Sequence, residues 1–66
     1  MFIVFESKIG FHSVKMSSVE AVRYLHNDTV IRFAFSNGEI VEYEYSDAFA
    51  AASEWLNIEK QMKGMV

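Results

Sequence analysis

The clearest hydrophobic pattern in this chain runs from Thr29 to Tyr45, where apolar and polar residues alternate on both sides of the tripeptide Ser36-Asn37-Gly38. Alternation with a period of two is typical of β-strands that are buried on one face. The segment therefore predicts a β-hairpin with strands at 29–35 and 40–45.

The length of the hairpin loop decides which residues share a face. A two-residue Asn37-Gly38 turn would pair Phe33 with Glu42 and would split the apolar residues between the two faces. A three-residue loop, with Gly38 in the left-handed conformation, pairs Phe33 with Val41 instead. We therefore predict the three-residue loop. It creates one aromatic face, made of Ile31, Phe33, Phe35, Val41, Tyr43 and Tyr45.

A third strand is predicted at 19–25, just before this hairpin. A two-residue Asn27-Asp28 turn pairs Tyr24 with Ile31, so Tyr24 joins the aromatic face. The opposite side of the three strands, which we call the mixed face, contains Arg23, Leu25, Val30, Arg32, Ala34, Ile40 and Glu42.

The N-terminal residues predict two more strands, Phe2–Phe5 and Ile9–Met16, joined by a turn at Glu6-Ser7-Lys8. Their apolar side chains exceed what one small core needs, so they either cover the mixed face or contact a second copy. We expect a homodimer in which Phe2 and Val4 lie on an edge strand at the interface.

The period changes from two to that of a helix after Ser46-Asp47. Ser46 is expected to cap a helix over 47–63, and Glu59 and Lys63 are spaced to form an ion pair on it. The helix carries one apolar stripe, made of Ala48, Ala51, Ala52, Trp55, Ile58 and Met62. The predicted fold class is α+β, an antiparallel meander of about five strands with this helix packed on the aromatic face.

Composition limits the function. The 66 residues make a single domain, 1–66, too small to spare a deep pocket from its core. The apolar run at the N-terminus is too short for a signal peptide or a membrane span, so we expect a cytoplasmic protein without membrane contact. The net charge of −3 gives no field that would attract nucleic acid.

Candidate chemistry is sparse. The two histidines, His12 and His26, have no metal-ligand spacing around them, so no metal or cofactor is expected. Ser13, Ser17 and Ser18 lie near His12 in sequence, but no third group is placed to orient the imidazole. We therefore expect no catalytic residues and no enzymatic activity.

The aromatic face has two possible roles. Phe33, Phe35, Tyr43 and Tyr45 resemble the platforms on which single-stranded nucleic acids stack their bases. The same face is also the only strongly apolar surface available for the helix, and nearby glutamates would repel phosphates. We therefore interpret these aromatic residues as core.

Three segments together resemble the KTSC domain, a small bacterial domain that also ends some lysyl-tRNA synthetases. They are Ser17-Ser-Val-Glu-Ala-Val-Arg-Tyr24, Val30-Ile-Arg-Phe-Ala-Phe-Ser-Asn-Gly38 and Val41-Glu-Tyr-Glu-Tyr45 before a helix, within about residues 17–56. The resemblance implies a meander with a helix and suggests RNA binding.

The function we predict is that of a small non-enzymatic interaction or regulatory module with a protein partner. Such modules are common among phage and mobile-element products. Its candidate interaction surface consists of Arg23, Arg32, Glu42 and Glu44. The alternative is an RNA-binding accessory domain of the KTSC type, which a cluster of Lys8, Lys15, Arg23 and Arg32 in the folded chain would favour.

Overall fold

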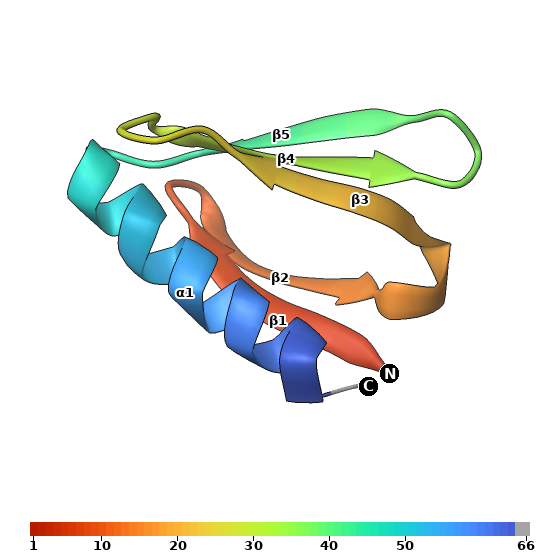
Figure 1. The fold of residues 1–66 in the computed structure, drawn as a ribbon. Helices are drawn as coiled ribbons and strands as arrows, with labels where there is room; N and C mark the ends of the chain where they lie inside the picture. The colour runs from red at the N-terminus through yellow and green to blue at the C-terminus, as the bar shows by residue number, and fades with distance from the viewer. Residues whose placement is uncertain (65–66) are drawn as a thin grey trace.

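The computed structural model describes residues 1–64 and confirms the α+β fold with five strands and a C-terminal helix. In chain order the elements are β1 (Phe2–Ser7), β2 (Gly10–Lys15), the short 3-10 helix η1 (Met16–Ser18), β3 (Val19–Tyr24), β4 (Val30–Phe35), β5 (Ile40–Glu44) and α1 (Ala48–Gly64). The strands form two antiparallel sheets, β1-β2 and β3-β4-β5. These sheets lie one above the other, and α1 runs beside β1 (Figure 1).

The β4–β5 hairpin has the predicted register. Phe33 is paired with Val41, and the N–H of Phe35 donates to the carbonyl oxygen of Glu39 over 2.8 Å, which closes a three-residue loop. Gly38 has a φ of 89°, the left-handed conformation that the loop requires. The local pattern was therefore enough to determine this hairpin.

The pairing of β3 with β4 is also confirmed, with Tyr24 opposite Ile31. Strand β3 ends at Tyr24, one residue earlier than predicted, because the chain turns after Leu25. The carbonyl oxygen of Leu25 accepts from the N–H of Asp28 over 3.0 Å, and Asn27 takes a positive φ of 63°.

The predicted turn at Glu6-Ser7-Lys8 is wrong. Strand β1 continues to Ser7, which pairs with Gly10, so the turn consists of Lys8 and Ile9. Gly10 has a φ of 135°, a conformation that other residues rarely adopt and that allows this tight return. The polar residues at 6 and 7 continue the strand alternation, and Ser7 points inward and is buried.

The aromatic face is covered mainly by the β1–β2 hairpin, which corrects two expectations. Phe5 of β1 stacks on Phe33 with ring centroids 5.0 Å apart and meets the ring of Tyr43 edge-on at 4.8 Å. The helix packs on the sheet as expected, but it closes the side of the core through Ala51 and Ile58. The N-terminal strands therefore neither cover the mixed face nor extend a single meander, because their inward residues supply a second apolar layer.

Helix α1 begins at a different cap from the predicted one. The carboxylate Oδ1 of Asp47, and not the hydroxyl of Ser46, accepts from the N–H of Ala50 over 2.7 Å. This is the ordinary geometry of an N-cap residue, and the charge of Asp47 also suits the positive end of the helix. The predicted pair of Glu59 and Lys63 is confirmed at 3.5 Å.

Side chains of α1 close the outer edge of β1. The N–H of Val4 donates to Oε1 of Gln61 over 2.9 Å, and Nε2 of Gln61 donates to the carbonyl oxygen of Val4 over 2.7 Å. The N–H of Glu6 donates to Oε1 of Glu54 over 3.1 Å. The helix thus supplies the hydrogen bonds that a neighbouring strand would otherwise make, which protects an edge prone to association.

Candidate interaction surface

The mixed face is the outer face of the β3-β4-β5 sheet, because the β1–β2 hairpin covers the aromatic face on the other side. Arg23 lies directly opposite Arg32, which in turn lies opposite Glu42, as the pattern predicted. Ile40 of β5 is 65% exposed, and Leu25, directly after the end of β3, is 63% exposed, so two large apolar side chains lie in solvent. This surface combines fixed charge with accessible apolar area.

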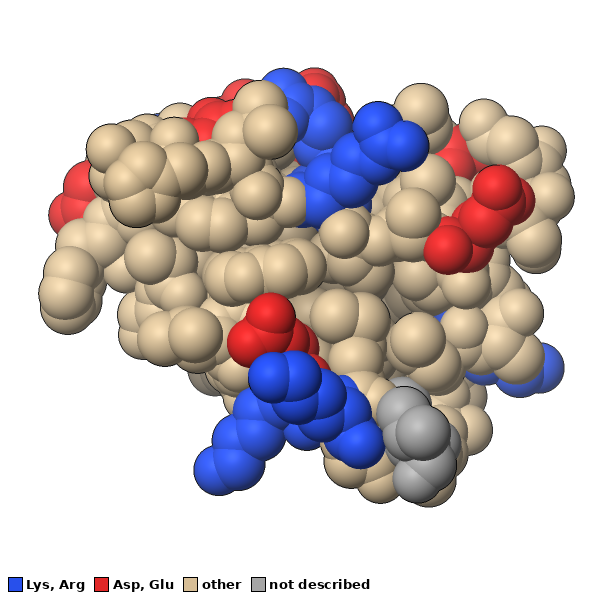
Figure 2. All heavy atoms as spheres, viewed as in Figure 1, with Lys and Arg blue, Asp and Glu red and all other residues tan. Residues whose placement is uncertain are grey.

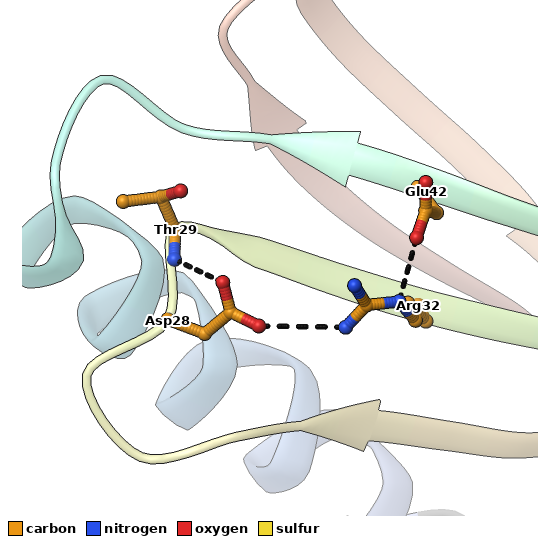
Figure 3. Close-up of polar contacts among 4 residues, drawn as sticks. All are labelled: Asp28, Thr29, Arg32 and Glu42. Carbon is orange, nitrogen blue, oxygen red and sulfur yellow. Dashed lines mark hydrogen bonds and ion pairs between the residues drawn. The ribbon is translucent and has the colours of Figure 1, made fainter.

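Two carboxylates hold Arg32 in place (Figure 3). Its Nε donates to Oε2 of Glu42 over 2.6 Å, and a terminal guanidinium nitrogen donates to Oδ2 of Asp28 over 3.4 Å. The other oxygen of Asp28 accepts from the N–H of Thr29 over 2.7 Å. The hydrogen bond that Arg32 donates to Glu42 is the main reason that the pKa of Arg32 is raised, and the guanidinium is charged at any physiological pH.

Asp28 was missing from the predicted surface. The sequence placed it in a turn, which is correct, but it also lies four residues before Arg32 and directs its carboxylate to that side chain. An aspartate at the end of a turn, beside the strand that carries a lone arginine, is the sequence signal that would have identified it.

Arg23 lies opposite Arg32 and has no ion pair within the described residues. Like charges directly across a pair of strands destabilise a sheet. The two arginines, with Ala34 and Ile40, line a shallow hollow of about 160 Å³. The hollow therefore has a positive wall and an apolar wall.

Glu44 lies at the far end of β5, opposite Val30. Its carbonyl oxygen accepts from the N–H of Lys8 over 2.9 Å, which ties the turn of the β1–β2 hairpin to β5. Its side chain is exposed on the same side of the strand as that of Glu42. The four predicted surface residues therefore share one face, with the acidic pair along β5.

The other predicted pair, Phe2 and Val4, lies on the outer face of the β1–β2 hairpin. Both side chains are exposed, and Phe11 of β2 is exposed on the same face. The backbone groups of Val4 that edge pairing would use are engaged by Gln61. Any contact with a second copy at Val4 would therefore use the face of the hairpin and not its edge.

The structure brings His12 to a serine that sequence reasoning did not consider. The Nε2 atom of His12 lies 2.6 Å from Oγ of Ser7, whereas Ser13 and Ser17 are exposed elsewhere. The Ser7 oxygen is buried and lies 3.4 Å from the N–H of Ile9, and the imidazole packs against the ring of Tyr43 at 4.5 Å. This bond satisfies polar groups between the two sheets, which buried hydroxyls require.

The aromatic face is core, as interpreted from the sequence. Phe33 is fully buried and Tyr45 is 9% exposed, so neither ring is available to a nucleobase. Of the four basic residues that an RNA-binding domain would gather, Arg23 and Arg32 are neighbours, while Lys8 lies in the turn before β2 and Lys15 at the far end of β2. Figure 2 shows basic and acidic side chains interspersed on a largely uncharged surface.

Among residues 1–64 there is no group of three or more histidine, aspartate or glutamate side chains arranged to hold a metal ion. Over the same residues, no helix has the length and apolar content needed to cross a bilayer. Comparisons with known protein families, curated proteins and solved structures found no match. The KTSC resemblance thus stays a prediction, and the surfaces described above are what the molecule offers as evidence of function.

Proposed function

We propose that this protein is a small non-enzymatic interaction module that binds an acidic segment of a protein partner on its mixed face. The observation that carries the proposal is the pairing of Arg23 with Arg32 next to exposed Leu25 and Ile40. Asp28 and Glu42 pair with Arg32, but Arg23 has no ion pair within the described residues, and a charge that breaks the rules of cross-strand pairing is expected at a functional site.

A carboxylate fits this position for electrostatic and geometric reasons. Placed in the hollow that Arg23 and Arg32 line, it would accept charge-assisted hydrogen bonds from Arg23, which has no ion pair within the described residues. Ala34 and Ile40, which line the same hollow, would supply apolar contact beside it. Arginine and large apolar residues are typical of the centres of protein interfaces.

A polyanion fits less well. Asp28 and Glu42 occupy Arg32 and Glu44 lies on the same face, so successive phosphates would meet carboxylates. Affinity for nucleic acid depends on many phosphate contacts and the counterions they release. RNA binding of the KTSC type is therefore the alternative that the experiment below must separate.

A homodimer is a second proposal, supported by a different surface. Phe2, Val4 and Phe11 leave apolar area exposed on the outer face of the β1–β2 hairpin. Burying this face against a second copy across a two-fold axis would remove it from water while the mixed face stays free.

The test compares two ligands on the same protein. A short peptide with two carboxylates between leucines and a single-stranded oligouridine are titrated into the labelled protein, and amide shifts are followed by NMR. We expect the peptide to shift the amide signals of residues around Arg23, Arg32 and Ile40. The substitution Arg23→Gln should remove these shifts. Lys15→Gln is the matched control, since it removes one positive charge from the hairpin.

Two results would contradict the proposal. One is binding of the peptide that Arg23→Gln leaves unchanged. The other is tighter binding of oligouridine with a steep salt dependence, which would support the RNA-binding alternative.

A further inference from the structure

Strand β2 has a free edge, because among residues 1–64 it pairs with β1 alone (Figure 1). The N–H of Val4 donates to Gln61 of α1, so the backbone groups of Val4 point away from β2, and Ser13 is the residue directly opposite Val4. Opposed residues of an antiparallel pair turn their backbone groups either toward each other or away, and the two cases alternate along the strands. The N–H and carbonyl groups of Phe11, Ser13 and Lys15 therefore point out from the free edge.

These outward backbone groups are unpaired. Within the described part of the chain none of them takes part in a hydrogen bond. The three residues are also exposed, and the side chain of Phe11 is 79% exposed. Unpaired N–H and carbonyl groups at every second residue form a template on which another extended chain can pair.

The other strand edges are protected. Side chains of α1 close the edge of β1. On β5 the exposed carboxylates of Glu42 and Glu44 lie along the edge strand, and the carbonyl oxygen of Glu44 already accepts from the N–H of Lys8. On β3 the pairing is irregular between Val19 and Ala21, and such a bulge bends an edge away from regular pairing. A regular strand edge without such protection is left at β2.

We propose that β2 binds an extended segment of a protein partner as an added antiparallel strand. Lys15 has no ion pair within the described residues, so an acidic residue opposite it would supply one. An aromatic residue opposite Phe11 would cover part of its exposed ring, and apolar residues between these positions would lie on the same side as the buried Val14. Read from its N-terminus, the partner segment is therefore acidic, apolar, small, apolar and aromatic.

A second copy of this chain is a poorer occupant of the edge. Pairing of two β2 strands across a two-fold axis through Ser13 would place Phe11 of each copy opposite Lys15 of the other. Neither lysine would then face a carboxylate, and neither phenylalanine would face an apolar residue. A segment of a different protein can satisfy both positions.

The experiment titrates the peptide acetyl-Glu-Val-Thr-Val-Phe-amide into the labelled full chain and follows amide shifts by NMR. We expect saturable shifts at residues 10–15. A peptide N-methylated at its threonine should bind about tenfold more weakly or worse, because this N–H faces the carbonyl oxygen of Ser13. A peptide N-methylated at both valines is the matched control and should bind as the parent does, because these N–H groups face away from β2.

Variants of the chain test the same edge from the other side. Ser13→Pro removes the outward N–H but keeps every hydrogen bond with β1, a position at which an edge strand accepts proline. It should weaken binding about tenfold or more, whereas Ser13→Ala, which keeps the N–H, should bind as the wild type does. Lys15→Glu should weaken binding about threefold to tenfold, and a peptide with lysine in place of its glutamate should restore it.

The inference is overturned if the peptide gives no saturable shift, or if methylation of the valines weakens binding as much as methylation of the threonine. It is also overturned if Ser13→Pro keeps the native spectrum and binds as the wild type does. If that variant does not fold, the methylated peptides decide on the wild-type chain.

Light scattering tests the competing occupant. A wild-type dimer that Ser13→Pro dissociates and Ser13→Ala leaves intact would show that a second copy takes the edge, and would overturn the proposal of a partner segment. Arg23→Gln should bind this peptide as the wild type does, because Arg23 lies in the other sheet. The outcome is therefore independent of the acidic-partner proposal.

Discussion

The two faces of the β3-β4-β5 sheet belong to the same strands but have opposite energetics. The inner, aromatic face is packed against Phe5 and contains the fully buried Ile31 and Phe33. The outer, mixed face sets Arg23 against Arg32 and leaves large apolar side chains in water. The aromatic face supplies the buried core and the mixed face stays exposed with an unpaired Arg23, which is why we propose binding at the mixed face.

The strongest test of this contrast is Phe33→Ala. The substitution leaves a cavity under Phe5 and Tyr43, and we expect it to lower the free energy of unfolding by about 3–5 kcal/mol, much of what so small a domain has. Equilibrium urea denaturation measures it. A loss below about 1 kcal/mol would mean that the ring is not in the core.

Tyr45→Phe tests the buried hydroxyl of the aromatic face, which has no hydrogen-bond partner within residues 1–64. Removing a buried hydroxyl that lacks a partner should raise the free energy of unfolding by about 1 kcal/mol. The raised pKa of Tyr45 adds a pH dependence. Because the folded protein holds the phenol proton more strongly than the unfolded chain, this proton contributes fully to the stability of the fold below the unfolded pKa of about 10. The contribution is lost as the pH rises above that value.

The measurement for Tyr45 is urea denaturation at neutral pH and at alkaline pH for both proteins. The wild type should lose more stability than the variant as the pH rises above about 10. A variant that is less stable at neutral pH would show that the hydroxyl has a stabilising partner.

Gln61→Ala tests the edge of β1 that the side chains of α1 close. The change removes both hydrogen bonds to Val4, and we expect a loss of about 1 kcal/mol together with concentration-dependent association through the exposed edge. Denaturation and light scattering follow the two effects. Asn57→Ala is the comparison variant: it removes the 3.4 Å contact to Val4 and the hydrogen bonds of Asn57 with Glu54 and Gln61, but it keeps both bonds between Gln61 and Val4, so it should change both measurements less.

Val4→Lys separates the face of the β1–β2 hairpin from the core. The side chain is exposed, so the change in stability should stay within about 0.5 kcal/mol, while the proposed dimer should dissociate. Light scattering at several concentrations gives the mass. A wild-type mass near 7.6 kDa throughout would contradict the dimer.

Arg23→Gln should have the smallest effect on stability, and it tests the mixed face, which is the outer side of the sheet. Removing the repulsion with Arg32 should leave the free energy of unfolding unchanged or raise it by a few tenths of a kcal/mol, roughly the value of one cross-strand pair. The same variant should no longer bind the acidic peptide. A large loss of stability would show that Arg23 serves the fold.

Much of the sheet follows from local pattern. The alternation around Ser36-Asn37-Gly38 permits one register that keeps the apolar residues together, and Gly38 supplies the conformation that this register needs. The mixed face, with Arg23, Arg32 and Glu42 in a row, follows from that register. Period and turn chemistry act over a few residues, so these features can be predicted from them.

What covers the aromatic face was decided by the tertiary structure. The sequence shows that Ile3 and Phe5 are apolar, but burial has no direction, so it cannot show which of two faces they meet. The contact of Gln61 with Val4 has the same origin, since it depends on how α1 is placed beside β1. The contacts of Ser7 with His12 and of Asp28 with Arg32 are local and depend on where each turn begins and ends. The chain by itself determined which side chains share a face, and only packing determined which faces meet.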